Sequence, residues 1–321
     1  MPVIPDSFLG GTAPHLQFFQ LKAIPFPGLP NLLFSATHLV HLVLYHIPHS
    51  GYFTPEAMVA LLSVLSSLKT IDLHFQSPQS RPDLESRRPP PLKLSVIPSL
   101  THFSFKGVSE YLEDLVACID APQLNSFYAI FFNQIDFDSP RLAHFINRTP
   151  TFRARDKVQV QFDDRSVHIK LMYRTHKFGH AISRIQIEIS CREPDWQLSS
   201  IAQVCNFSLP PLTMVEDFYI EHRYSQLVWK NDAIENTLWL ELLLPFTMVK
   251  NLYLAEEFAP GIAAALQELV GDRITEVLPS LRNIFVKKLE PSGRFQKNIE
   301  EFVSARQLSG HSVAISVWNE E

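Results

Sequence analysis

A six-residue apolar phrase recurs along the chain and restricts the folds that the chain can adopt. A complete copy has large apolar residues at its first, fourth and sixth positions, and the residues between them are mostly polar or aromatic. The two clearest copies span residues 249–254 and 281–286, 32 residues apart. Less regular copies begin at residues 16, 39, 68, 100, 124 and 215. We therefore expect repeating units with one strand each.

Helix signals lie between these copies. Thr54 offers an N-cap, Pro55 suits the first helical position, and Glu56 places an acid in the first turn. Apolar residues follow at helical spacing from Met58 to Leu65. We expect further helix starts at Ser109, Ser139, Asp195 and Asn231 or Asp232, a last helix around Ile299–Arg306, and a closing strand over residues 312–318.

Alternating strands and helices at this spacing are the pattern of a leucine-rich repeat, whose units bury their apolar residues only by stacking on neighbours. The predicted fold is an α/β leucine-rich-repeat solenoid, with a curved, mostly parallel sheet and helices on the convex side. We expect residues 1–321 to form a single domain. Two segments depart from the repeat: a Pro-rich exposed loop at 77–91, and a strand-rich insertion at about 152–192, with a turn at Asp163–Arg165.

Composition narrows the functional classes. The net charge is −5 and the basic residues are scattered, which disfavours nucleic acid as a partner. Three cysteines without a CxxC motif suggest reduced thiols. The sequence shows no signal peptide and no long apolar run, so we expect no membrane partner and a cytoplasmic or nuclear protein.

Catalytic motifs are missing from the sequence, so we expect no enzyme, no catalytic residues and no cofactor. Four histidines crowd the second phrase, at positions 38, 41, 46 and 49, and they suggest a metal site as an unlikely alternative. Residues three apart on a strand point to opposite faces, so His38 and His41 are poorly placed to share a metal. Asp163-Asp164 and Glu256-Glu257 fit solvated charges at a turn and a helix start.

The residues between the apolar positions are the candidate binding residues, because they point to the concave face of the sheet. In the later phrases the middle residue is Tyr128, Tyr219, Tyr253 or Phe285. A solvent-facing sheet gains nothing in folding from aligned aromatic rings, so we expect a protein partner there. The alternative is that a terminal segment folds over the rings. The full predicted set is His41, Tyr45, His74, His102, Tyr128, Tyr219, Glu221, Tyr253, Phe285 and Lys287.

Several long phrases also resemble a known family. SATHLVHLVLYHIPHSGYFTPEAM, KGVSEYLEDLVACIDAP and FAPGIAAALQELVGDRITEVLPSL are similar to the F-box/leucine-rich-repeat family of mushroom-forming (agaricomycete) fungi, and the similarity covers almost the whole chain. The resemblance implies a leucine-rich-repeat fold and the substrate-receptor role of a Skp1–cullin–F-box ubiquitin ligase.

One feature of that family is not visible in this chain. Family members carry an N-terminal helical F-box, whereas here the first phrase begins at Leu16. We expect either a truncated F-box protein or a stand-alone leucine-rich-repeat scaffold without a ligase link. In both cases the expected function is non-enzymatic recognition of a protein substrate.

Overall fold

The computed structural model of the chain describes residues 8–25, 31–82, 93–134, 137–153, 155–174, 181–209, 211–223, 234–269, 271–287 and 294–318. The chain divides into two compact units, Met1–Arg153 and Ala154–Glu321, and each is described by itself. Both units combine mostly parallel strands with helices, which confirms the mixed α/β class. That the whole chain is one domain stays a prediction.

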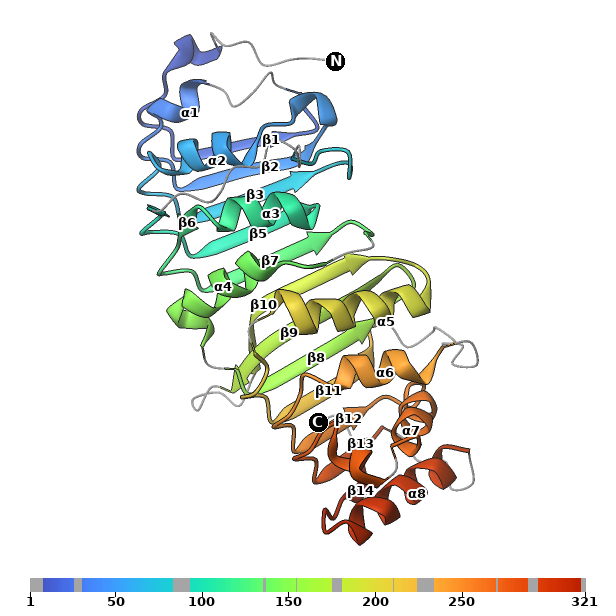
Figure 1. Cartoon of the computed structure of the whole chain (residues 1–321). Helices are drawn as coiled ribbons and strands as arrows, with labels where there is room; N and C mark the ends of the chain where they lie inside the picture. The colour runs from blue at the N-terminus through green and yellow to red at the C-terminus, as the bar shows by residue number, and fades with distance from the viewer. Residues whose placement is uncertain are drawn as a thin grey trace. The chain divides into compact units, whose positions relative to one another are not determined.

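The first unit contains a parallel sheet whose strands follow the order of the chain (Figure 1). The strands are β1 (Phe18–Lys22), β2 (His41–Ile47), β3 (Thr70–Phe75), β5 (His102–Gly107) and β7 (Ser126–Phe131). Their register aligns the fourth residue of each phrase, namely Phe19, Leu42, Ile71, Phe103 and Phe127. All five are buried, because alternate strand residues point to the same side of a sheet.

Helices cover one face of this sheet, as Figure 1 shows for α2, α3 and α4. The described helices are α1 (Asn31–Ser35), α2 (Pro55–Leu62), α3 (Ser109–Val116) and α4 (Pro140–Arg148), with 3-10 turns η1 (Phe8–Gly11), η2 (His49–Gly51) and η3 (Pro150–Phe152). Short strands β4 (Ser95–Val96) and β6 (Ile119–Asp120) form a separate parallel pair. The predicted N-cap is confirmed, because Ala57 N donates to Thr54 Oγ1 at 3.3 Å.

Of the other two predicted helix starts of this unit, Ser139 is confirmed as the N-cap position of α4, whereas the N-cap of α3 lies one residue before Ser109. Ser109 is the first residue of α3, and Val108 takes the N-cap position. Ser139 takes the N-cap position of α4, but its side chain makes no capping hydrogen bond. Glu113 of α3 caps α4 instead, since its carboxylate accepts from Arg141 N at 3.1 Å and Leu142 N at 2.6 Å.

The second unit contains a sheet with the strand order β10-β9-β8-β11-β12-β13-β14. Strands β8 (Lys157–Phe162), β9 (Ser166–Arg174) and β10 (Ala181–Ser190) are antiparallel neighbours, so the strands expected in this segment are present. Strands β8, β11 (Asp217–His222), β12 (Asn251–Leu254), β13 (Asn283–Val286) and β14 (Ala314–Val317) are parallel. The expected closing strand is therefore present as β14.

The helices of this unit follow the sequence pattern with shifted starts. They are α5 (Pro194–Gln203), α6 (Asn236–Leu243), α7 (Ala259–Gln267) and α8 (Arg294–Leu308), with a π-turn η4 (Val204–Ser208) and a 3-10 turn η6 (Gly271–Thr275). Glu193 takes the N-cap position of α5, and the predicted cap, Asp195, lies in the first turn. Asn231 and Asp232 lie outside the described residues, as do residues 83–91 of the Pro-rich loop.

Candidate interaction face

Three aromatic rings are stacked on the second sheet, across neighbouring strands. The parallel register pairs Tyr219 of β11 with Tyr253 of β12, and Tyr253 with Phe285 of β13. The ring centroids of Tyr219 and Tyr253 are 4.1 Å apart and those of Tyr253 and Phe285 are 4.7 Å apart, with nearly parallel planes. We call these three residues the ring stack. Its members alternate with buried neighbours such as Leu252 and Ile284, so they face away from the apolar core.

A row of two amide side chains and one carboxylate lies beside the ring stack, two residues earlier on each strand. Asn283 Nδ2 donates to Asn251 Oδ1 at 2.7 Å, and Asn251 Nδ2 donates to Asp217 Oδ1 at 2.7 Å. Side chains two residues apart on a strand share one face. The same face of the second sheet thus carries an aromatic row and a hydrogen-bonded polar row.

Charged groups border the ring stack. Lys157 Nζ lies 3.6 Å from the centroid of the Tyr219 ring, which is a cation–π contact. Gln159 Nε2 donates to Glu221 Oε2 at 2.7 Å. Lys287 Nζ lies 6.0 Å from the ring centroid of Trp318. Apolar rings with charges at the edge form a surface that suits a protein partner.

The expectation that all these rings face solvent is wrong for Tyr219, which is only 8% exposed. Trp318, next to the end of β14, packs edge-on against Tyr219 at 5.7 Å and Tyr253 at 5.5 Å. Tyr253 and Phe285 remain half-buried. The alternative of a terminal segment lying over the rings therefore holds at Tyr219 and in part at Tyr253.

The first sheet carries a different group of predicted residues. His74 Nε2 and Ser104 Oγ form a 2.8 Å hydrogen bond, and the Tyr45 ring lies edge-on to His74 at 4.6 Å. Burial, followed by the positive charge of Lys106, lowers the pKa of His74 to about 4. Burial and the nearby Asp72 carboxylate raise the pKa of Tyr45. At neutral pH this group therefore presents uncharged rings.

Three further predicted residues lie outside the ring stack and outside the group around His74. His41 and His102 are exposed, and the His41 ring lies 6.0 Å from Phe18, whose side chain is 54% exposed. Tyr128 is half-buried on β7 of the first unit. The ring stack therefore contains three of the four residues of the predicted aromatic column.

A buried polar cluster in the second unit was not foreseen from the sequence. Asp163, expected to be a solvated charge, is 7% exposed, and its Oδ1 accepts from Arg165 N and Ser166 N. His168 is fully buried, with Nε2 2.9 Å from Ser166 Oγ and Nδ1 3.4 Å from Glu188 Oε2. The alternating Ser166 and His168 beside an acidic turn are the signal that would have suggested the cluster.

The cluster has the members of a serine–histidine–carboxylate triad, but its geometry favours a structural role. Arg223 Nη1 lies 2.9 Å from His168 Nε2, and a guanidinium can only donate, so this nitrogen accepts and the ring proton resides on Nδ1. Ser166 is 5% exposed and its hydroxyl also reaches Asp163 Oδ2 at 2.9 Å. Burial lowers the pKa of His168, so the neutral ring is favoured in the fold.

The four crowded histidines are dispersed in the first unit. His38 stacks on His15 at 6.1 Å, and His49 Nδ1 lies 3.5 Å from Ser80 Oγ. Within the described part of the chain, no three His, Cys, Asp or Glu side chains are grouped so that they could hold a metal ion. Cys118, Cys191 and Cys205 are free thiols.

Comparisons with known proteins add no family. No protein-family model matches the chain, and neither a curated protein nor a solved structure matches it. Across the described helices, none has the length and apolar character needed to span a bilayer. The proposal below therefore rests on the sequence pattern and on the geometry of the two sheets.

Proposed function

We propose that this chain is a non-enzymatic protein-recognition module with a leucine-rich-repeat solenoid fold. Eight apolar phrases, parallel strands in matching register and helices between the phrases support the fold. Such units expose one side of the strands, and proteins of this architecture use that side for binding.

The ring stack carries the proposal. Tyr253 and Phe285 keep part of their rings accessible. Lys157 and Lys287 lie over the rings of Tyr219 and Trp318, which both contact Tyr253. Tyrosine and other aromatic residues are favoured anchors in protein interfaces, where loss of one costs ~2 kcal/mol or more of binding free energy. We therefore assign the partner surface to the ring-stack face, and His41, Tyr45, His74, His102 and Tyr128 to a corresponding face of the first sheet.

The proposed biological role rests on the family resemblance alone. An F-box/leucine-rich-repeat protein of this kind is the substrate receptor of a Skp1–cullin ubiquitin ligase, and the recognised face selects the protein to be modified. A stand-alone scaffold uses the same face without a ligase. Co-purification with Skp1 distinguishes the ligase receptor from the scaffold. If Skp1 does not co-purify with this chain, the scaffold is favoured.

A photo-crosslinking experiment tests the recognition face. A photoreactive phenylalanine analogue is placed at Phe285, and the matched control carries it at Trp196 of α5, an aromatic residue that is 48% exposed. Both variants are irradiated in cell extract, and the crosslinked proteins are identified by mass spectrometry. We expect a discrete adduct at Phe285, absent at Trp196 and lost when Tyr253→Ser is added.

Two outcomes would contradict the proposal. One is the same set of adducts at both positions, which indicates nonspecific capture. The other is an adduct at Phe285 that persists in the Tyr253→Ser background while circular dichroism shows an intact fold. In that case the ring stack is not the anchor of the interface.

A further inference from the structure

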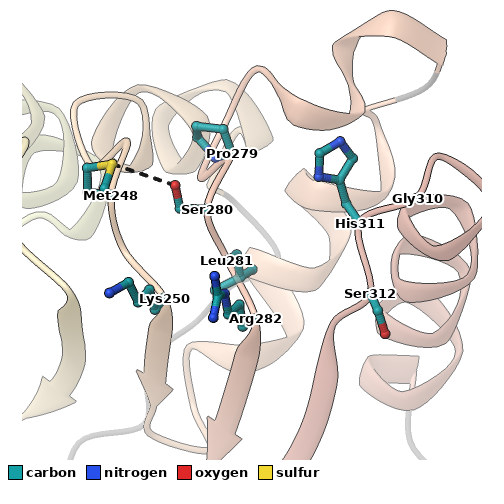
Figure 2. A pocket seen from close by; sticks show the side chains of 9 residues that line it. All are labelled: Met248, Lys250, Pro279, Ser280, Leu281, Arg282, Gly310, His311 and Ser312. Carbon is teal, nitrogen blue, oxygen red and sulfur yellow. Dashed lines mark hydrogen bonds between the residues drawn. The ribbon is translucent and has the colours of Figure 1, made fainter.

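A cavity of about 320 Å³ opens beside the starts of β12, β13 and β14 in the second unit (Figure 2). Lys250 and Arg282 precede β12 and β13 at equivalent positions, because Asn251 and Asn283 are register partners. His311 and Ser312 approach from the segment before β14. The cavity thus gathers basic side chains from three successive strand starts in a chain whose net charge is −5.

The charges around this cavity are not balanced by its lining. Lys250 Nζ is paired with Glu216 Oε1 at 2.7 Å. The guanidinium of Arg282 is exposed and makes no hydrogen bond or ion pair with any residue that the structure describes, and the same holds for the His311 ring. No acidic residue lines the cavity. Arg282 therefore supplies a positive charge that nothing on the walls neutralises.

One wall of the cavity is held in a strained shape. Leu278, just before the lining segment 279–282, has a φ of 50°, a conformation that non-glycine residues rarely adopt. The fully buried Arg306 fixes this turn, donating to Leu278 O at 3.0 Å and Pro279 O at 3.3 Å. Strained backbone of this kind is often found at binding sites, where it pre-organises the groups that contact a ligand.

We propose that this cavity binds an oxyanion, a carboxylate or a phosphate, attached to a small apolar body. The planar guanidinium of Arg282 suits two parallel hydrogen bonds to such a group. The hydroxyl of Ser280 has only a weak described contact, with Met248 Sδ at 3.8 Å, which an oxyanion would replace (Figure 2). Met248, which is 44% exposed, offers an apolar wall, and the volume lies at the small end of ligand pockets.

Isothermal titration calorimetry of the full chain tests the proposal with three probes: phenyl phosphate, benzoate and inorganic phosphate. We expect saturable one-to-one binding of phenyl phosphate, benzoate or both, and the stronger of the two identifies the oxyanion. Inorganic phosphate, which lacks an apolar body, is expected to bind at least several-fold more weakly than the stronger organic probe. Arg282→Gln is expected to weaken the binding about ten-fold or more.

Arg192→Gln is the matched control, because Arg192 is an exposed arginine of the same unit that does not line the cavity. It is expected to leave the affinity unchanged. His311→Gln is a second test variant with an expected several-fold loss, in case Arg282→Gln changes the melting temperature. The proposal is overturned if neither organic probe saturates, if Arg192→Gln weakens binding as much as the cavity variants, or if inorganic phosphate binds as tightly as the stronger organic probe.

This site is independent of the proposed function, since it needs no contact with the ring stack. Tyr253→Ser, which is expected to abolish the crosslinked adduct, should leave calorimetric binding of the probes unchanged. Failure of the partner surface and failure of the anion site are therefore distinguished by the two measurements.

Discussion

Single side chains in this protein have environments that set their chemistry, and His74 is a clear case. Its ring lies against Tyr45 and hydrogen-bonds to Ser104, while Lys106 lies near enough to disfavour a second positive charge. Burial is the larger cause of its lowered pKa. The neutral ring is thus part of the folded structure, and protonation must weaken that structure.

We predict that His74 titrates near pH 4 and that the first unit loses stability as pH falls. In the unfolded chain a histidine takes up its proton near pH 6.5, so between that value and about 4 the unfolded state binds more protons than the fold. Stability is therefore complete above pH 6.5 and declines below it, by on the order of 1–2 kcal/mol between pH 7 and pH 5 for this residue. NMR of the ring protons gives the midpoint, and urea unfolding gives the stability.

The control for this prediction uses two glutamine variants. His74→Gln should remove its share of the pH dependence, whereas His144→Gln, on the exposed side of α4, should not. A His74 midpoint near 6.5 would contradict the prediction, because it would show that the ring is not buried in a neutral form.

A second prediction for a single residue concerns Arg306. Its buried guanidinium donates to Ile274 O at 2.9 Å and to Leu278 O and Pro279 O, so one cation satisfies several carbonyl groups of a single turn. Arg306→Lys should cost about 3 kcal/mol of unfolding free energy, because a compact ammonium cannot span these acceptors and leaves buried carbonyls without donors. Arg273→Gln, which breaks an exposed ion pair with Glu276, should cost less than ~0.5 kcal/mol in the same urea titration.

At the scale of elements, helices of the first unit depend on their neighbours along the chain. The Glu113 carboxylate of α3 bonds the first free backbone N–H groups of α4, and Asp114 forms a 2.9 Å ion pair with Arg141. An anionic group at a helix N-terminus also interacts favourably with the helix dipole. The start of α4 is therefore stabilised by the preceding helix.

We predict that Glu113→Ala destabilises the first unit by about 1–2 kcal/mol, because it removes both capping bonds and leaves the helix start unsatisfied. Glu113→Gln should lose less, since an amide oxygen still accepts hydrogen bonds. Glu56→Ala is the matched control, because Glu56 is an exposed acid in the first turn of α2. Equal losses for Glu113→Ala and Glu56→Ala in urea unfolding would contradict the assigned cap.

The same helices show how far local sequence determines structure. Thr54 caps α2 as its own sequence predicts, because the capping bond spans three residues. Glu113 and Trp318 contact residues that lie 28 or more positions away in the sequence. These contacts form only when successive strands and helices pack together, so no local pattern predicts them. The alternation of Tyr219, Tyr253 and Phe285 did predict their shared face, but not the cover that Trp318 gives to Tyr219. Strand phrases were predictable because burial repeats along them with period two.

At the scale of the whole molecule, the division between Arg153 and Ala154 should limit which strands lose stability when a core residue is substituted. Within each unit, the main strands pair with near neighbours, so the stability of a strand depends mainly on the strands beside it. Leu252 is fully buried on β12 between β11 and β13. A substitution that leaves a cavity at Leu252 should therefore weaken β11, β12 and β13 before other strands.

We predict that Leu252→Ala costs ~2–5 kcal/mol in the second unit while the first unit keeps its stability. Hydrogen–deuterium exchange measures this directly: the backbone amides of β11, β12 and β13 should exchange faster, whereas those of β2, β3 and β5 should keep their wild-type rates. The reciprocal variant, Leu73→Ala on the fully buried core side of β3, should reverse the pattern. Faster exchange throughout the chain in either variant would mean that the two units unfold as one cooperative body, which would also extend the effect of any partner bound at the ring stack to the first sheet.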